Sequence, residues 1–183
     1  MSSEFGAIMQ LGYVVKDVDA AAREWATRLS AGPFYLLDNM IFDQYYFRGI
    51  RTDLEMCLAF GYWNNMQIEL IKPINDADTL YSRALRSSPG KLNHCATVVP
   101  DVDALLTRRQ LQDRVIQSGK MPTGLKFVYL EEYLPGGLHL ELIEAQQDTL
   151  MAFAGMEPAS RHWDGNEPVR PIARLQEDLA ALR

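Results

Sequence analysis

Residues 10–20 read QLGYVVKDVDA and residues 94–104 read HCATVVPDVDA, so both stretches contain Val-Val-x-Asp-Val-Asp-Ala. A second matching pair follows in the same order, with QIELI at residues 67–71 and HLELI at residues 139–143. Self-similarity of this kind indicates a repeated structural unit. The sequence therefore predicts a duplicated module, with a difference in length absorbed between the two shared pieces.

Each half has the pattern of a strand, a helix and a run of further strands. Residues 8–15 are rich in β-forming side chains, and the acidic cluster at 17–19 can cap a helix that runs to about Leu29. Further strands are predicted in this half at about 34–38, 41–49, 54–62 and 67–72. For the second half we expect a strand at 92–99, a helix from Asp101 to about Ser118, and strands near 125–131 and 138–144.

The two modules predict one α+β domain over residues 6–145. The modules cover about 6–74 and 91–145, and a short linker helix joins them over about 76–88. Residues 146–183 form a C-terminal extension. It ends in an amphipathic helix whose apolar stripe, which needs a surface to cover on this chain or on a neighbour, consists of Ile172, Leu175, Leu179 and Leu182.

Composition restricts the class of protein. The chain has 183 residues, of which 48% are hydrophobic and 23% charged, and its formal net charge is −6. An acidic chain argues against nucleic-acid and anionic-membrane partners. We find neither an apolar run that could cross a bilayer nor a signal-peptide pattern, so we expect a cytoplasmic protein. Cys57 and Cys95 are the only cysteines, which excludes a cysteine-built zinc site.

Four polar residues occupy matching positions in the two halves. Gln10 and His94 lie on the first strand of each module, and Glu69 and Glu141 lie mid-strand on the last, between apolar neighbours. One interpretation places both carboxylates on the solvent face. In the other, the four side chains converge across a cleft between the modules, because a buried carboxylate needs a partner. These ligand types suit one divalent ion: Zn, Ni, Co, Mn or Fe.

At these residues the sequence resembles the vicinal oxygen chelate superfamily. QLGYVVKDVDAAAREWATRLSAGPF is similar to the start of its first βαβββ module, and LNHCATVVPDVDAL is similar to the start of the second. The resemblance implies a glyoxalase/bleomycin resistance/dioxygenase fold with a single metal held by Gln10, Glu69, His94 and Glu141. This ligand set is closer to that of glyoxalase I than to that of methylmalonyl-CoA epimerase, although the two-module layout is compatible with both.

The resemblance also implies a reaction class. We expect a metal-dependent lyase or isomerase that removes a proton next to the carbonyl of a small carbonyl or thioester substrate. Glu141 is the first candidate for the base and Glu69 the second. Tyr46, Arg48 and His139 are weaker candidates for substrate contacts. Two other functions stay open, a metal-free binder like the bleomycin-resistance proteins and an Fe(II) dioxygenase, against which Gln10 argues. The two modules can complete the site within one chain or by exchange in a homodimer.

Overall fold

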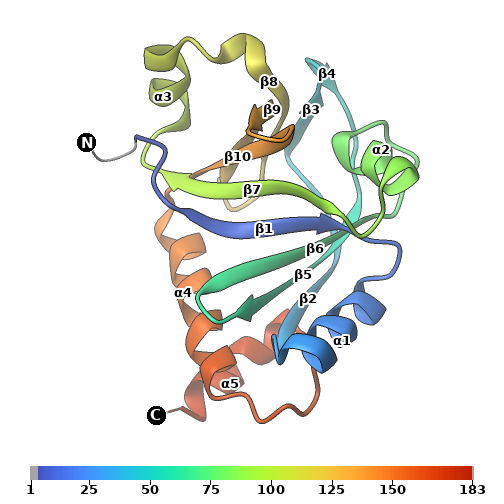
Figure 1. The fold of residues 1–183 in the computed structure, drawn as a ribbon. Helices are drawn as coiled ribbons and strands as arrows, with labels where there is room; N and C mark the ends of the chain where they lie inside the picture. The colour runs from blue at the N-terminus through green and yellow to red at the C-terminus, as the bar shows by residue number, and fades with distance from the viewer. Residues whose placement is uncertain (1–3, 183) are drawn as a thin grey trace.

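A mixed sheet runs through the part of the chain that the computed structural model describes, residues 4–182. In order across the sheet its strands are β11 (Val169–Pro171), β2 (Phe34–Met40), β5 (Met56–Trp63), β6 (Met66–Pro73), β1 (Ile8–Val14), β7 (Leu92–Val99), β10 (Leu138–Glu144), β9 (Lys126–Leu134), β8 (Val115–Lys120), β3 (Gln44–Phe47) and β4 (Ile50–Arg51). Strands β1 and β7, which begin the two repeats, lie side by side at its centre (Figure 1).

The two halves of the sheet are built alike. In the first half, β1 is followed by helix α1 (Val18–Leu29), and in the second β7 is followed by helix α3 (Val102–Arg109). The first strand of each half then pairs in parallel with its last strand, β1 with β6 and β7 with β10. The remaining strands of each half pair antiparallel. The predicted α+β fold of two paired βαβββ modules is therefore confirmed.

The shared Asp-Val-Asp-Ala motif is a helix start in both halves. The Asp17 side chain accepts a hydrogen bond from the backbone amide of Ala20 at 2.9 Å, and Asp101 does the same for Ala104 at 2.8 Å. These side chains satisfy amides that have no partner within the helix.

The helix predicted from Asp101 to about Ser118 is wrong in its second part. Helix α3 ends at Arg109 because Gln110 adopts a left-handed conformation, with φ of 54°. A short 3-10 turn, η1 (Gln112–Arg114), follows, and residues 115–120 form β8, the outermost strand of the second module. A non-glycine residue in this conformation carries little sequence signal for a helix end.

The segment predicted as a strand at 41–49 leaves its own half of the sheet. Strands β3 and β4 lie at the far edge, where β3 pairs antiparallel with β8 and Gln44 lies opposite Lys120. The linker between the halves contains α2 (Leu80–Ser87), which is capped by Thr79 and Ser82.

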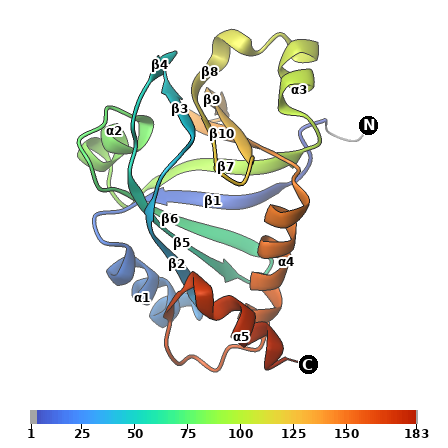
Figure 2. The same cartoon turned by 180° about the vertical axis from the view of Figure 1, so that it is seen from behind.

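The C-terminal extension returns to the first half of the sheet. Helix α4 (Gln147–Arg161) lies against β5, and β11 adds to the edge of the sheet by pairing in parallel with β2. The chain then forms η2 (Ile172–Arg174) and α5 (Leu175–Ala180), seen beside α4 in Figure 2. Leu175 is buried and Leu179 packs against the core, whereas Leu182 is exposed. Most of the predicted stripe thus covers its own chain.

None of the helices within residues 4–182 is both long and apolar enough to span a membrane.

Candidate metal centre

The four predicted ligands come from the four central strands. Glu69 lies on β6, Gln10 on β1, His94 on β7 and Glu141 on β10, and all four are buried, with exposed fractions of 7%, 1%, 0% and 6%. Successive side chains along a strand point to opposite faces of the sheet, so every second residue of each strand points to the interior. The structure therefore brings these side chains to one side of the sheet, on either side of the boundary between the modules.

Three of the four side chains make close contacts with one another. The imidazole Nε2 of His94 lies 3.2 Å from Oε2 of Glu69 and 3.3 Å from Oε2 of Glu141. Ligand atoms of Glu69, His94 and Glu141 all lie within 4.8 Å of one another. Ligands placed 2.0–2.2 Å from one ion are separated by roughly 3–4 Å, so these contacts are close to the spacing of a metal site.

The pKa values at the site show that its carboxylates stabilise a positive charge. Burial lowers the pKa of His94, but Glu141 and Glu69 raise it more, and the pKa is raised to about 9. Burial raises the pKa of Glu69, and the neighbouring charge of Glu141 adds to this, while His94 acts in the opposite direction. Two buried carboxylates next to each other stabilise a cation between them, whether that cation is a proton on His94 or a metal ion.

Unpaired oxygens provide a test of whether a metal fits. Within the described residues, the buried Oε1 of Gln10 accepts no hydrogen bond, and the buried Oε2 atoms of Glu69 and Glu141 both lie next to the same group, Nε2 of His94. Gln10, Glu69 and Glu141 line the same cavity. A buried acceptor without a donor is costly, and two buried carboxylates that share one imidazole nitrogen are incompletely compensated, so a cation between them would satisfy all three oxygens. Oxygen ligands with one imidazole nitrogen, and two carboxylate charges, fit a divalent ion.

Gly12 makes the room that the His94 ring occupies. It lies opposite His94 in the β1–β7 pair, and a Cβ atom at this position would come within 1.8 Å of Cε1 of His94. The ring also packs edge-on against Tyr129, with centroids 4.9 Å apart, and its Nδ1 lies 3.2 Å from Oδ1 of Asn93. Because Nδ1 can donate to Asn93, Nε2 is the nitrogen that would bind a metal ion once it gives up its proton.

A small apolar cavity of about 50 Å³ adjoins the candidate ligands. Its walls are mostly methionine and aromatic side chains, including Met40, Phe42, Met121, Phe127 and Phe153. Among the residues that the structure describes, no Lys or Arg lines it. Such a wall suits an uncharged group and offers no partner for an anionic one.

Sequence reasoning did not single out Tyr81 and Tyr129, two buried tyrosines next to the candidate ligands. The hydroxyl of Tyr81 donates to that of Tyr129 at 2.7 Å, and Tyr129 Oη lies 3.4 Å from Nε2 of His94. Burial raises the pKa of Tyr45 far above its usual value, and the charge of Glu141 acts in the same direction. These hydroxyls therefore stay protonated. An excess of aromatic residues in strands was the only sequence signal, and it also describes an ordinary core.

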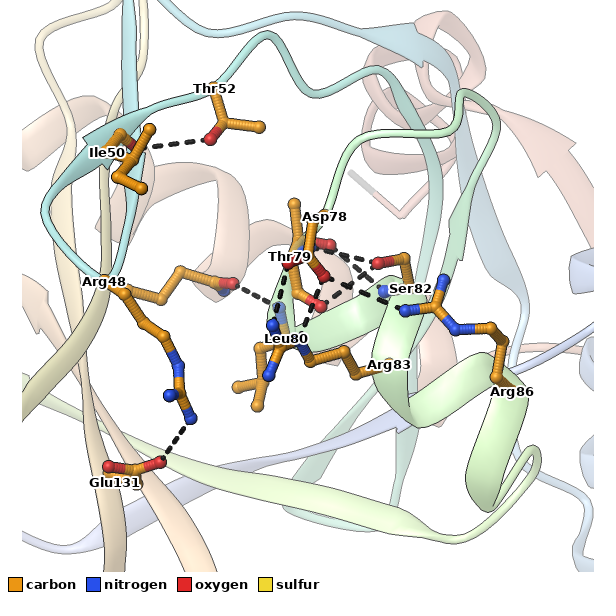
Figure 3. A network of polar contacts seen from close by, with 11 residues as sticks. Arg48, Ile50, Thr52, Asp78, Thr79, Leu80, Ser82, Arg83, Arg86 and Glu131 are labelled. Carbon is orange, nitrogen blue, oxygen red and sulfur yellow. Dashed lines mark hydrogen bonds and ion pairs between the residues drawn. The ribbon is translucent and has the colours of Figure 1, made fainter.

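Tyr46 and Arg48 are not brought to the four candidate ligands, whereas His139 lies beside His94 in the β7–β10 pair. Tyr46 faces away from its buried neighbour Tyr45 and lines a separate hollow next to Lys120. Arg48 lies at the surface, where its guanidinium points to Glu131 at 3.3 Å (Figure 3). His139 is half-buried, and its Nδ1 accepts a hydrogen bond from a backbone amide of β9 at 3.0 Å. Their roles in substrate binding stay predictions.

Comparisons with known proteins agree with this arrangement. A family model described as "Glyoxalase/Bleomycin resistance protein/Dioxygenase superfamily" matches residues 9–129. The search of curated protein sequences returned no match.

Among solved structures, methylmalonyl-CoA epimerase from Mycobacterium tuberculosis is similar over 82% of this chain and 95% of its own, with 19% identity and a TM-score of 0.54. A hypothetical protein, BH1468, from Bacillus halodurans C-125 is similar over 77% and 95%, with 15% identity and a TM-score of 0.54. A selenomethionine methylmalonyl-CoA epimerase structure is similar over 80% of this chain and 100% of its own, with 16% identity and a TM-score of 0.52. At these identities the similarity shows the fold.

Proposed function

Since the chain belongs to the glyoxalase/bleomycin resistance protein/dioxygenase superfamily, we propose that it is a metal-dependent lyase or isomerase that removes a proton next to a substrate carbonyl group. The observation that carries the proposal is the convergence of Gln10, Glu69, His94 and Glu141. These side chains are buried, Oε1 of Gln10 has no hydrogen-bond donor among the described residues, and the carboxylates of Glu69 and Glu141 share the single Nε2 of His94.

In this proposal the four side chains hold one divalent ion. The two carboxylates balance its charge, and the amide of Gln10 and the imidazole of His94 complete the protein ligands. When bound, such an ion stabilises the negative charge that develops on a substrate oxygen as the neighbouring C–H bond loses its proton. The ion's identity, among Zn, Ni, Co, Mn and Fe, is decided by the binding experiment below.

The proton acceptor is a carboxylate of the site. We assign this role first to Glu141, because of the family resemblance, and second to Glu69. Both side chains line the apolar cavity. A general base must lie within reach of the proton that it removes, and a substrate in this cavity would lie next to both carboxylates.

The walls of the cavity indicate a small uncharged carbonyl substrate. With no Lys or Arg among its described lining residues, the cavity would bury a substrate carboxylate without a counter-ion. Methionine side chains such as Met40, Met56 and Met121 are flexible and can adjust to the shape of an entering apolar group. A substrate panel should therefore include neutral ketones and aldehydes beside methylmalonyl-CoA and glutathione adducts of methylglyoxal.

Metal binding is the first test. Protein stripped with a chelator is titrated calorimetrically with Zn²⁺, Mn²⁺, Ni²⁺, Co²⁺ and, in the absence of oxygen, Fe²⁺, and we expect one ion per chain. The variant Glu69→Gln should lose most of this affinity. The variant Glu131→Gln, which removes a surface carboxylate paired with Arg48, is the matched control and should not.

Proton abstraction is the second test. The loaded protein is mixed with the substrate panel in D₂O, and the loss of a C–H signal next to the carbonyl is followed by NMR. Exchange that requires the metal supports the proposal. Tight binding of an aromatic ligand without metal would instead indicate a binding protein, and oxygen consumption with Fe²⁺ would indicate a dioxygenase.

A further inference from the structure

A chain of hydrogen bonds leads from the C-terminal helix α4 to Gln10. The backbone carbonyl of Phe153 accepts a hydrogen bond from the hydroxyl of Tyr62 at 3.2 Å. Nε2 of Gln67 donates to the same hydroxyl at 3.3 Å, and Nε2 of Gln10 donates to Oε1 of Gln67 at 2.8 Å. Tyr62 is 7% exposed, Gln67 is 0% and Gln10 is 1%, so bulk water has little access to this chain.

The backbone carbonyl of Phe153 fixes the direction of every hydrogen bond in this series. A side-chain amide can turn by 180°, exchanging its oxygen and its NH₂ group with almost no change in shape. A backbone carbonyl can only accept, so Tyr62 gives its one proton to Phe153. Gln67 must then present NH₂ to Tyr62 and its oxygen to Gln10. Gln10 in turn presents NH₂ to Gln67, which leaves its own oxygen without a donor.

We propose that Tyr62 and Gln67 are positioning residues of the metal centre, and that the C-terminal segment sets the amide of Gln10 with its oxygen, rather than its nitrogen, toward the ion. This inference rests on the proposed function. An amide NH₂ group directs two protons at whatever it faces and repels a cation, whereas the amide oxygen is a ligand for divalent ions. The orientation of Gln10 thus matters as much as its presence.

A second hydrogen bond between α4 and β5 fixes the position of the helix that carries Phe153. The hydroxyl of Ser160 on α4 donates to the backbone carbonyl of Tyr62 at 3.2 Å, which attaches the helix to β5 a second time. The Phe153 ring packs against Phe60 of β5, with centroids 5.7 Å apart, and lines the cavity beside the candidate ligands. The extension therefore supplies both a wall of the site and the acceptor that orients one ligand.

The test removes single links of the chain and measures metal affinity. Tyr62→Phe deletes only the hydroxyl, and Gln67→Met breaks the next link with a side chain of similar size. Each is expected to weaken Co²⁺ or Zn²⁺ binding by about 10-fold, a typical loss for a group that orients a ligand. Tyr133→Phe, a half-buried tyrosine of β9 that packs on Phe5, is the matched control and should bind as the wild type does.

A double-mutant comparison separates positioning from a general loss of structure. In a Gln10→Ala background the hydrogen bonds of Tyr62 and Gln67 have no amide ligand to orient, so adding Tyr62→Phe should not change metal affinity further. The absorption spectrum of bound Co²⁺ should also change in Tyr62→Phe and stay unchanged in Tyr133→Phe. If Tyr62→Phe does not fold, Gln67→Met gives the same test at the neighbouring link.

Two results would overturn the inference, and they differ from each other. Wild-type affinity in both Tyr62→Phe and Gln67→Met would remove the positioning role while the metal centre stands. A wild-type protein that binds no divalent ion would remove the proposed function and this inference with it.

Discussion

The two halves of the sheet place equivalent residues around the site but support them in different ways. Backbone pairing sets Glu69 beside Gly12 in the first half and Glu141 beside Ala96 in the second. The carboxylates are thus the same residue at the same place. The candidate ligands on the first strands differ, because an amide stands in one half where an imidazole stands in the other.

Each kind of ligand has the support that its chemistry needs. Gln10 is held by the directional bonds to Gln67 and onward to the C-terminal segment. His94 is held by the edge of the Tyr129 ring and by the space above Gly12. A side-chain amide needs hydrogen bonds that orient its oxygen toward a bound ion, whereas an imidazole needs space for the ring and neighbours that fix the ring plane. Duplication therefore supplies the backbone frame, and the surroundings of each half decide which side chain works in it.

The largest expected effect tests the equivalence of the two carboxylates. Glu69→Gln and Glu141→Gln should each weaken metal binding by about 100-fold, because each removes one charge from a buried ionic cluster, a loss worth about 3 kcal/mol. Calorimetric titration measures both. At saturating metal, only Glu141→Gln should abolish C–H exchange of the substrate. Metal affinities of the two variants that differ by more than about 10-fold would show that the halves are not equivalent.

The second prediction concerns the small residues that face the carboxylates. Gly12→Ala puts a methyl group into the His94 ring and should destabilise the protein by about 2 kcal/mol, as overpacking of a core does, while lowering metal affinity. Ala96→Gly at the equivalent place should cost about 0.5–1 kcal/mol through chain entropy and leave metal affinity unchanged. Urea denaturation measures both, and a Gly12→Ala protein with wild-type stability and metal affinity would contradict the assigned role of Gly12.

The sequence was sufficient to locate the four candidate ligands for a physical reason. Side chains alternate along a strand, and the repeat places Gln10 with His94 and Glu69 with Glu141, so one assumption about facing modules fixes all four. The same reasoning named Tyr46 on a strand with aromatic residues on both faces, whereas the structure buries Tyr45 and turns Tyr46 toward a separate hollow. Which of the two is buried depends on the pairing of this strand with β8, which belongs to the other half of the chain.

Features that depend on contacts between distant segments were not predictable. The helix expected up to Ser118 stops at Gln110, in a left-handed conformation that the sequence does not signal. The links from Phe153 through Tyr62 and Gln67 join three segments, and none of them carries a local motif. Long-range packing decides such positions, and a single sequence does not reveal it.

The third prediction uses acid to test the covering of the first half. On α5, Asp178 accepts hydrogen bonds from Arg170 and from the Tyr35 hydroxyl of β2, both at 2.7 Å. Burial raises the pKa of Asp178, but Arg170 and Tyr35 lower it more, so the pKa in the folded protein lies below the ordinary value of about 3.9. A lowered pKa stabilises the folded state above pH 4, and this contribution is lost as the pH falls through the folded value.

Hydrogen exchange can follow that loss segment by segment. As the pH falls below about 4, α4 and β11 should open before β10, because α4 packs on β5 and β11 pairs with β2, both strands of the first half. Asp178→Asn should lower stability at pH 7 by about 1.5 kcal/mol, the value of a hydrogen bond to a charged group, and should flatten the pH dependence. Simultaneous opening of α4 and β10 in wild-type protein would show that the segment is not a separate unit.

The smallest expected effect is at His139, which pairs with His94 as Gln67 pairs with Gln10. His139 is half-buried and accepts from the amide of Glu132, so it orients no ligand of the site. His139→Gln keeps an acceptor for that amide and should change stability by less than about 0.5 kcal/mol. Metal affinity should change by less than about 3-fold, against about 10-fold for Gln67→Met. Equal losses in the two variants would mean that the halves support their ligands symmetrically, and the distinction between amide and imidazole support would then be wrong.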